Sequence, residues 1–186
     1  MAPKVKVTRE DIVEASVGIV RMVSIESLNA RAIATALNCS TQPIFSNFAS
    51  MEELHLAVIE RAYSIYQGYL QREVDEGIYP TYKATGMAYI RFAKEERELF
   101  KLLFMCDRSE QQDFGKWEFD DMTLDIVRNS TGLDENTMKF FHLEVWAYVH
   151  GIATMFATGF LDLDWDMVSR MLTDAYLGLR KQYGME

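Results

Sequence analysis

Helix signals follow one another along the whole chain, whereas strand signals are nearly absent. Apolar residues recur three and four positions apart, and most such segments open with Ser, Thr, Asn or Asp, the residues that cap helix N-termini. There is no repeat period and no low-complexity linker. The pattern predicts an all-α chain of about nine helices. They are expected near residues 9–22, 29–38, 40–48, 50–76, 81–93, 95–105, 109–130, 134–158 and 165–182.

Cap residues define most of the expected helix boundaries. Thr8 with Asp11 and Ser50 with Glu53 have the spacing of capping boxes, and Ser109 with Gln112 has the same spacing. Further starts are predicted at Asn29, Ser40, Asp134 and Asp164. The second helix is expected to stop at Asn38, the long helix at Gly77 and Pro80, and the seventh near Gly132, because these residues favour or force helix termination.

The charge of the chain is unevenly distributed. The formal net charge is -9, which by itself argues against a nucleic-acid partner. Residues 1–50 hold five basic and four acidic groups, so that they carry +1 and residues 51–186 carry -10. The first fifty residues are therefore electrostatically distinct from the rest.

Composition excludes two further classes of protein. The 49% apolar and 12% aromatic content excludes a disordered chain, and two cysteines cannot form a disulfide framework.

The segment 29–48 has the pattern of two short capped helices joined by a tight turn. This pattern fits a helix-turn-helix, whose second helix enters the major groove, and it equally fits an αα-hairpin in a helical bundle. Ser40, Thr41 and Gln42 occupy the N-terminal end of the second helix, the end that reaches base edges. Gln42 can pair with adenine, and Thr41 can donate or accept a hydrogen bond or place its methyl group on thymine.

The order of capped helices continues into a pattern of single residues at fixed spacings, which are Ile33, Ala34, Leu37, Ser40, Ile44, Phe45, Phe48, Glu53 and Leu54. In this pattern the chain from Ile12 to Leu54 resembles the tetracycline-repressor (TetR) family of transcription regulators. The resemblance implies a three-helix DNA-binding head at 1–50, a helical ligand-binding and dimerisation domain at 51–186, and a homodimer on an operator with two-fold symmetry. It further implies a repressor that a small molecule releases from DNA.

The head departs from the family pattern at several positions. Phe45 and Asn47 stand where Tyr and His are usual, Met51 where a basic residue is common, and Ser24 where Gly is usual. These changes imply fewer phosphate contacts, which Lys4 and Lys6 on an N-terminal arm, together with Arg31, would partly replace. The predicted DNA-binding residues are Lys4, Lys6, Arg31, Ser40, Thr41, Gln42, Phe45 and Asn47.

The C-terminal half carries a second resemblance, to a ligand-domain variety of this family marked by a Trp-x-x-x-His-Gly run, here Trp146 to Gly151. Aromatic and methionine side chains indicate an apolar or aromatic effector. His150 is a candidate donor to that ligand, although a lone His on such a face is more often a core group. The predicted pocket walls are Tyr66, Tyr69, Phe92, Phe104, Trp117, Met122, Trp146 and His150.

The last two helices are expected to form the dimer. Segment 134–158 is apolar on nearly every side, which demands cover on every side, and segment 165–182 has one clean apolar stripe. In a chain this short, a second copy is the natural cover. The predicted interface residues are Phe156, Val168, Met171, Leu172, Ala175 and Leu179.

No catalytic, cofactor or metal motif is apparent. The sequence lacks a phosphate loop, a dinucleotide fingerprint and a zinc-type His-Glu-x-x-His, and His142 and His150 lie too far apart along a helix to share a metal. We therefore expect a non-enzyme without metal or cofactor. No apolar stretch suits a signal or a membrane span, so a cytoplasmic protein is expected. The alternative to a ligand-responsive repressor is a ligand- or partner-binding dimer of the same fold that has lost operator binding.

Overall fold

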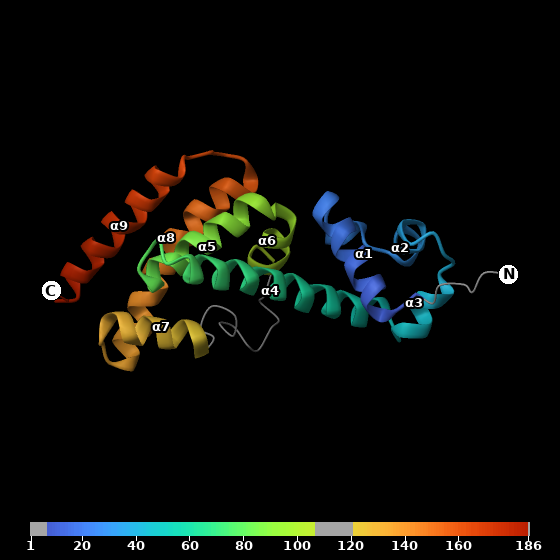
Figure 1. The fold of residues 1–186 in the computed structure, drawn as a ribbon, viewed down its shortest axis with the longest axis horizontal. Coiled ribbons are helices and arrows are strands. Elements are labelled where there is room, and N and C mark those ends of the chain that lie inside the picture. Colours follow the sequence, from blue (N-terminus) through green and yellow to red (C-terminus); the bar gives the residue numbers. More distant parts are fainter. Residues whose placement is uncertain (1–6, 107–120, 186) are drawn as a thin grey trace. The chain divides into compact units, whose positions relative to one another are not determined.

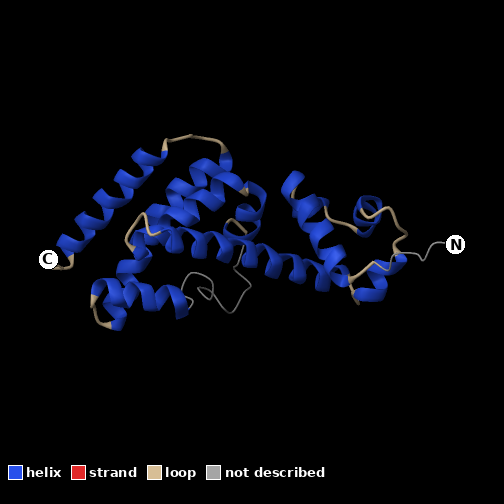
Figure 2. Ribbon diagram, in the orientation of Figure 1, coloured by secondary structure: helices blue, strands red, loops and turns tan. Residues whose placement is uncertain are grey.

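The computed structural model describes residues 7–106 and 121–185, and every regular element in these ranges is helical (Figure 2). This confirms the all-α prediction. Figure 1 labels the α-helices. They are α1 (Arg9–Met22), α2 (Ala30–Ala36), α3 (Gln42–Asn47), α4 (Met51–Glu76), α5 (Thr81–Glu95), α6 (Arg97–Phe104), α7 (Asp121–Thr131), α8 (Glu135–Thr158) and α9 (Trp165–Gln182), with a short 3₁₀ turn at Ile25–Ser27.

The predicted caps account for several helix ends. The backbone N–H of Asp11 donates to Thr8 Oγ1 at 3.1 Å while Thr8 N–H donates to Asp11 Oδ2 at 2.9 Å, so the capping box is confirmed. Asn29 Oδ1 accepts from two N–H groups at the start of α2. Asn38 has φ 49° and Gly77 has φ 64°, the left-handed conformation that ends a helix.

One predicted helix start is wrong, and another lies outside the described residues. Ser40 is not the cap of the third helix. Thr41 precedes α3 with helical angles (φ -73°, ψ -13°), its carbonyl accepts from Ile44 N–H at 3.2 Å, and no side chain caps this end. The helical turn thus starts after Ser40, with Pro43 in its first turn as expected. The capping box predicted at 109–112 lies outside the described residues.

The chain divides into two units. Unit 1 comprises Met1–Gln67 with Glu96–Cys106, and unit 2 comprises Gly68–Glu95 with Asp107–Glu186. In unit 1, α1 packs against α2, α3 and α6, and the buried apolar residues form its core (Figure 1). Those that are almost fully buried include Ile12, Val17, Val20, Ile33, Ile44, Phe48, Leu54, Leu99 and Phe100.

Unit 2 is built around the packing of α5 along α8, with α7 and α9 on the same pair (Figure 1). The close approach depends on Gly86 of α5, because a Cβ there would lie 3.3 Å from Leu172 Cδ1 and 3.5 Å from Val149 Cγ2. One buried cluster joins α5, α7 and α8 through Tyr82, Val127, Met138 and Phe141. Unit 2 therefore has a core of its own.

Candidate functional site

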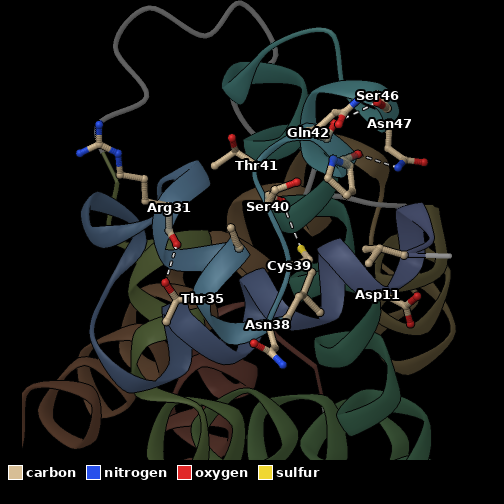
Figure 3. Close-up of a pocket in the computed structure, with 14 residues that line it drawn as sticks. Asp11, Arg31, Thr35, Asn38, Cys39, Ser40, Thr41, Gln42, Ser46 and Asn47 are labelled. Carbon is tan, nitrogen blue, oxygen red and sulfur yellow. Dashed lines mark hydrogen bonds between the residues drawn. The ribbon is translucent and has the colours of Figure 1, made fainter. Parts of the chain in front are cut away.

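A broad groove of about 1590 Å³ in unit 1 is bordered by α2, α3 and the turn between them (Figure 3). It brings together three of the predicted base-reading side chains: Ser40 and Gln42 are exposed, and Thr41 is half-buried. The short turn from Asn38 to Ser40 and the backbone of Thr41 set their order. The geometry is that of a helix-turn-helix with its second helix accessible from outside.

The other predicted DNA contacts lie at different places on unit 1. Arg31 on α2 lines the groove, and its guanidinium extends away from the other labelled side chains (Figure 3). Phe45 is 55% exposed and does not line the groove. Asn47 does line it, and its Nδ2 donates to the carbonyl of Pro43 at 2.8 Å. Lys4 and Lys6 lie outside the described residues.

Arg9 at the start of α1 holds the end of α3. Its Nη1 donates to the carbonyl of Asn47 at 2.7 Å and to Glu53 Oε1 at 2.9 Å, and its guanidinium carbon lies 3.9 Å from the Phe48 ring centroid. The other Glu53 oxygen accepts from Ala49 N–H at 2.7 Å. The Ala49 N–H and then Arg9 lower the pKa of Glu53. Arg9 thus positions α3, a role that its sequence position did not reveal.

Two of the basic residues in the head are committed to carboxylates. Arg9 pairs with Glu53, and Arg21 pairs with Glu96 through two hydrogen bonds of 2.8 and 2.6 Å. Arg31 is exposed and forms no ion pair within the described part of the chain. The head therefore offers DNA fewer cations than its five basic residues suggest.

Six of the predicted pocket residues occur in three aromatic pairs within the described part of the chain. Tyr66 and Phe104, in unit 1, have ring centroids 5.2 Å apart, whereas Tyr69 and Phe92, in unit 2, are 5.4 Å apart, both edge-on. The third pair follows on α8. Trp146 stacks on His150 at 4.8 Å, and His150 Nδ1 shares a 2.9 Å hydrogen bond with the hydroxyl of Tyr89. Trp117 and the side chain of Met122 lie outside the described parts.

Unit 2 also contains a cavity of about 470 Å³ between α5, α8 and α9, the size of a small-molecule site. Its lining includes Tyr82, Lys83, Tyr148, Thr173 and Arg180, and none of the six predicted pocket residues whose side chains are described. Lys83 is not among the pocket residues predicted from the sequence. The signal that could have identified it is that no other charged residue stands between Glu76 and Arg91.

Comparisons with known proteins address the family directly. A family model described as the tetracyclin repressor-like C-terminal domain matches residues 82–176, just over half of the chain. The chain belongs to the TetR family. Members of this family are DNA-binding transcriptional regulators that also bind small-molecule effectors.

The fold agrees with a member of the TetR family. A crystal structure of a TetR-like transcriptional regulator from Rhodococcus sp. RHA1 matches with a TM-score of 0.69 over 97% of this chain and 99% of that chain. The sequences are 16% identical, so the likeness concerns the fold. No curated protein matches the sequence.

In this TetR family chain, three of the six residues predicted to form the dimer interface are wrongly assigned. Phe156, Val168 and Leu172 are 1%, 0% and 7% exposed, so their side chains are buried within the chain and cannot form the surface of an interface. The apolar stripe of α9 packs inward because α9 contacts both α5 and α8. Met171, Ala175 and Leu179 are half-buried, and their assignment to an interface stays a prediction.

The described residues of this TetR family chain contain no group of three or more His, Cys, Asp or Glu side chains arranged to hold a metal ion. Within the same ranges, no helix combines the length and apolar character that crossing a membrane requires.

Proposed function

We propose that this chain is a repressor that binds a two-fold operator as a homodimer and is released by a small molecule with an apolar body. The DNA-binding head would occupy residues 1–50 and the ligand-binding and dimerisation domain residues 51–186. The observation that carries the proposal is the groove of unit 1, where Ser40, Thr41 and Gln42 stand together at the accessible start of α3.

The side chains at this end suit base edges better than phosphates. Gln42 carries both a donor and an acceptor for the adenine edge, and Thr41 supplies a hydroxyl and a methyl group. Arg9 holds the C-terminal end of α3 through its hydrogen bonds to the Asn47 carbonyl and to Glu53. The side chains proposed to contact bases therefore stand on a fixed helix. Phe45, 55% exposed on the same helix, can pack against the sugar or a thymine methyl.

Phosphate contacts would be few. Of the basic residues in the head, Lys4, Lys6 and Arg31 remain once Arg9 and Arg21 are assigned to their carboxylates. Each neutralised phosphate adds about 0.9 to the slope of log affinity against log salt. A dimer with three such residues in each head should therefore show a slope no steeper than about -5.

A dimer surface is available on α8. Phe140, Leu143, Ala147 and Gly151 are all exposed and follow one another at helical spacing, and we call them the α8 stripe. Phe140 is 57% exposed and Leu143 40%. The stripe combines large apolar side chains with the small residues Ala147 and Gly151. This combination suits close packing against the same stripe of a second copy, as a two-fold interface requires. This stripe replaces the buried residues Phe156 of α8 and Val168 and Leu172 of α9 in our proposal for the interface.

The test is fluorescence anisotropy with labelled duplexes from the promoter beside the chain's own gene, between about 50 and 200 mM salt. We expect sequence-specific binding, a shallow salt slope and a two-fold symmetric site in footprints. Binding of all duplexes alike, or of none, would contradict the operator proposal and favour a ligand- or partner-binding dimer that has lost DNA binding.

A further inference from the structure

The cavity of unit 2 has an unusual charge pattern for its surroundings. Two basic residues, Lys83 and Arg180, line it, and none of its lining residues is acidic. The chain as a whole carries -9, and residues 51–186 carry -10, so acidic residues outnumber basic ones in the part of the sequence that forms it. A cavity that keeps only cations in such a body attracts an anion.

Lys83 lies between hydroxyl groups rather than beside a carboxylate. Its Nζ donates to Ser169 Oγ at 2.7 Å and to Thr173 Oγ1 at 2.8 Å, and it stands 4.8 Å from the Tyr79 ring centroid. Among the described residues it forms no ion pair. An ammonium group has three N–H donors, so one remains for a further acceptor.

Lys83 is half-buried, and its two hydrogen bonds to hydroxyl groups bring no opposite charge to the ammonium group. Desolvation lowers the pKa of its ammonium group. An anion beside it would favour the charged form and restore that pKa. The Thr173 hydroxyl, which donates to the carbonyl of Ser169 at 3.0 Å, is held in place to accept from Lys83. The ammonium group therefore has a defined position at the wall of the cavity.

The rest of the lining is mainly apolar and aromatic. Val145 and Val149 come from α8, Leu172 and Tyr176 from α9, and Tyr82 from α5. The volume of about 470 Å³ lies within the range of about 300–1,000 Å³ in which small-molecule sites fall. One charged group and an apolar body are thus the features that a matching ligand needs.

We propose that this cavity binds a small carboxylic acid with an apolar body, whose carboxylate accepts the remaining N–H of Lys83 Nζ. The apolar part of the ligand lies between the valines of α8 and the aromatic rings. In assigning this ligand as the effector, the inference rests on the proposed function, whereas the binding itself does not. A carboxylate head group thus refines the apolar or aromatic effector expected from sequence.

The test uses isothermal titration calorimetry on the full chain without DNA, with octanoate, 1-octanol and octylamine as probes that share one tail. We expect octanoate to bind with one molecule per chain and at least about tenfold more tightly than octanol, the value of a charge-assisted hydrogen bond. Lys83→Met should remove this preference and leave octanol binding unchanged. Lys181→Met is the matched control, since Lys181 is an exposed lysine of α9 that does not line the cavity.

Several results would overturn the proposal. These are equal octanoate affinity in Lys83→Met and in the unaltered chain, equal affinity of the unaltered chain for octanoate and octanol, and no octanoate binding at millimolar concentration. Should Lys83→Met fail to fold, Ala175→Phe provides a second test. Ala175 lines the cavity, and a larger side chain there should weaken octanoate and octanol alike. Unchanged binding in that variant would also overturn the proposal.

A parallel operator titration separates the two proposals. Octanoate binding that weakens operator affinity supports both. Octanoate binding with unchanged operator affinity keeps the carboxylate site and contradicts its role as the effector site. Octanoate binding by a chain that recognises no operator contradicts the proposed function alone.

Discussion

Arg21 of α1 donates two hydrogen bonds to Glu96, from Nε to Oε2 at 2.8 Å and from Nη2 to Oε1 at 2.6 Å. Glu96 directly follows α5 and precedes α6, while Arg21 stands in the last turn of α1. The Glu96 side chain is 15% exposed, so this pair is better shielded from water than the other ion pairs of the head. It joins the last turn of α1 to the start of α6 within unit 1.

Replacing Glu96 with Gln should loosen the last turn of α1. Because Arg21 remains 41% exposed, we expect a loss of less than about 1 kcal/mol in unfolding free energy. Local opening should increase more clearly, seen as faster amide hydrogen exchange over residues 17–22. Arg61→Gln is the control, since it removes the Arg61–Glu14 pair between α4 and α1 and should leave that turn unchanged. Equal exchange in both variants would argue against a local role for Glu96.

Replacing Gln42 with Ala should reduce sequence preference rather than affinity for DNA in general. We expect a loss of about 1–3 kcal/mol for the operator and no change in the salt slope, because Gln42 is expected to contact a base edge. Arg31→Ala should weaken all duplexes alike and reduce the slope. Anisotropy titrations at several salt concentrations distinguish the two. Similar behaviour of both variants would show that base and phosphate contacts are wrongly assigned.

The contribution of Glu53 to stability should disappear in acid. The Ala49 N–H and Arg9 lower its pKa from the ordinary 4.5, so the folded state favours the carboxylate. Its stabilising effect is therefore present above pH 4.5 and is lost as the pH falls through the lowered pKa of the folded state. Glu53→Gln should be less stable than the unaltered chain at neutral pH, and the difference should vanish below that pKa. Urea unfolding between neutral and acidic pH measures it; a constant difference would contradict this explanation.

The Tyr82–His142 hydrogen bond should contribute to the stability of unit 2. The Tyr82 hydroxyl lies 2.9 Å from His142 Nδ1, and both residues are buried, at 8% and 6% exposure. Burial also raises the pKa of Tyr82, which keeps its phenol neutral. Tyr82→Phe should lower the unfolding free energy by about 1–3 kcal/mol, because a buried polar group loses a partner. Tyr148→Phe, at a 40% exposed position, is the control for thermal unfolding, and equal Tm values would contradict the prediction.

A charge on the α8 stripe should prevent dimer formation. Leu143→Glu places a carboxylate opposite its own copy in a two-fold interface, and like charges there oppose association. Sedimentation at several protein concentrations should show a monomer, and operator binding should weaken because one head alone meets half a site. Glu135→Gln, an exposed change at the start of the same helix, is the control. A dimer in Leu143→Glu would place the interface elsewhere.

Local sequence signals determined the helical architecture because they act within a few residues. Thr8, Asn29, Asn38, Asp134 and Asp164 play the roles that their side chains predict, since a cap depends only on the adjacent turn. The order of three short helices and a long one likewise identified the family. Ser40 is not the cap because Thr41 already has helical angles and takes the cap position one residue later.

Tertiary packing alone decided which faces are buried and which charges are neutralised. The stripe of Val168 and Leu172 looks the same in the sequence whether it meets α5 and α8 or a second chain, because helical spacing shows a face without its partner. Arg9 pairs with Glu53, 44 residues away, and Lys83 reaches hydroxyls 86 and 90 residues further along the chain. Such contacts depend on folding, whereas the cap and the helix depend on neighbouring residues.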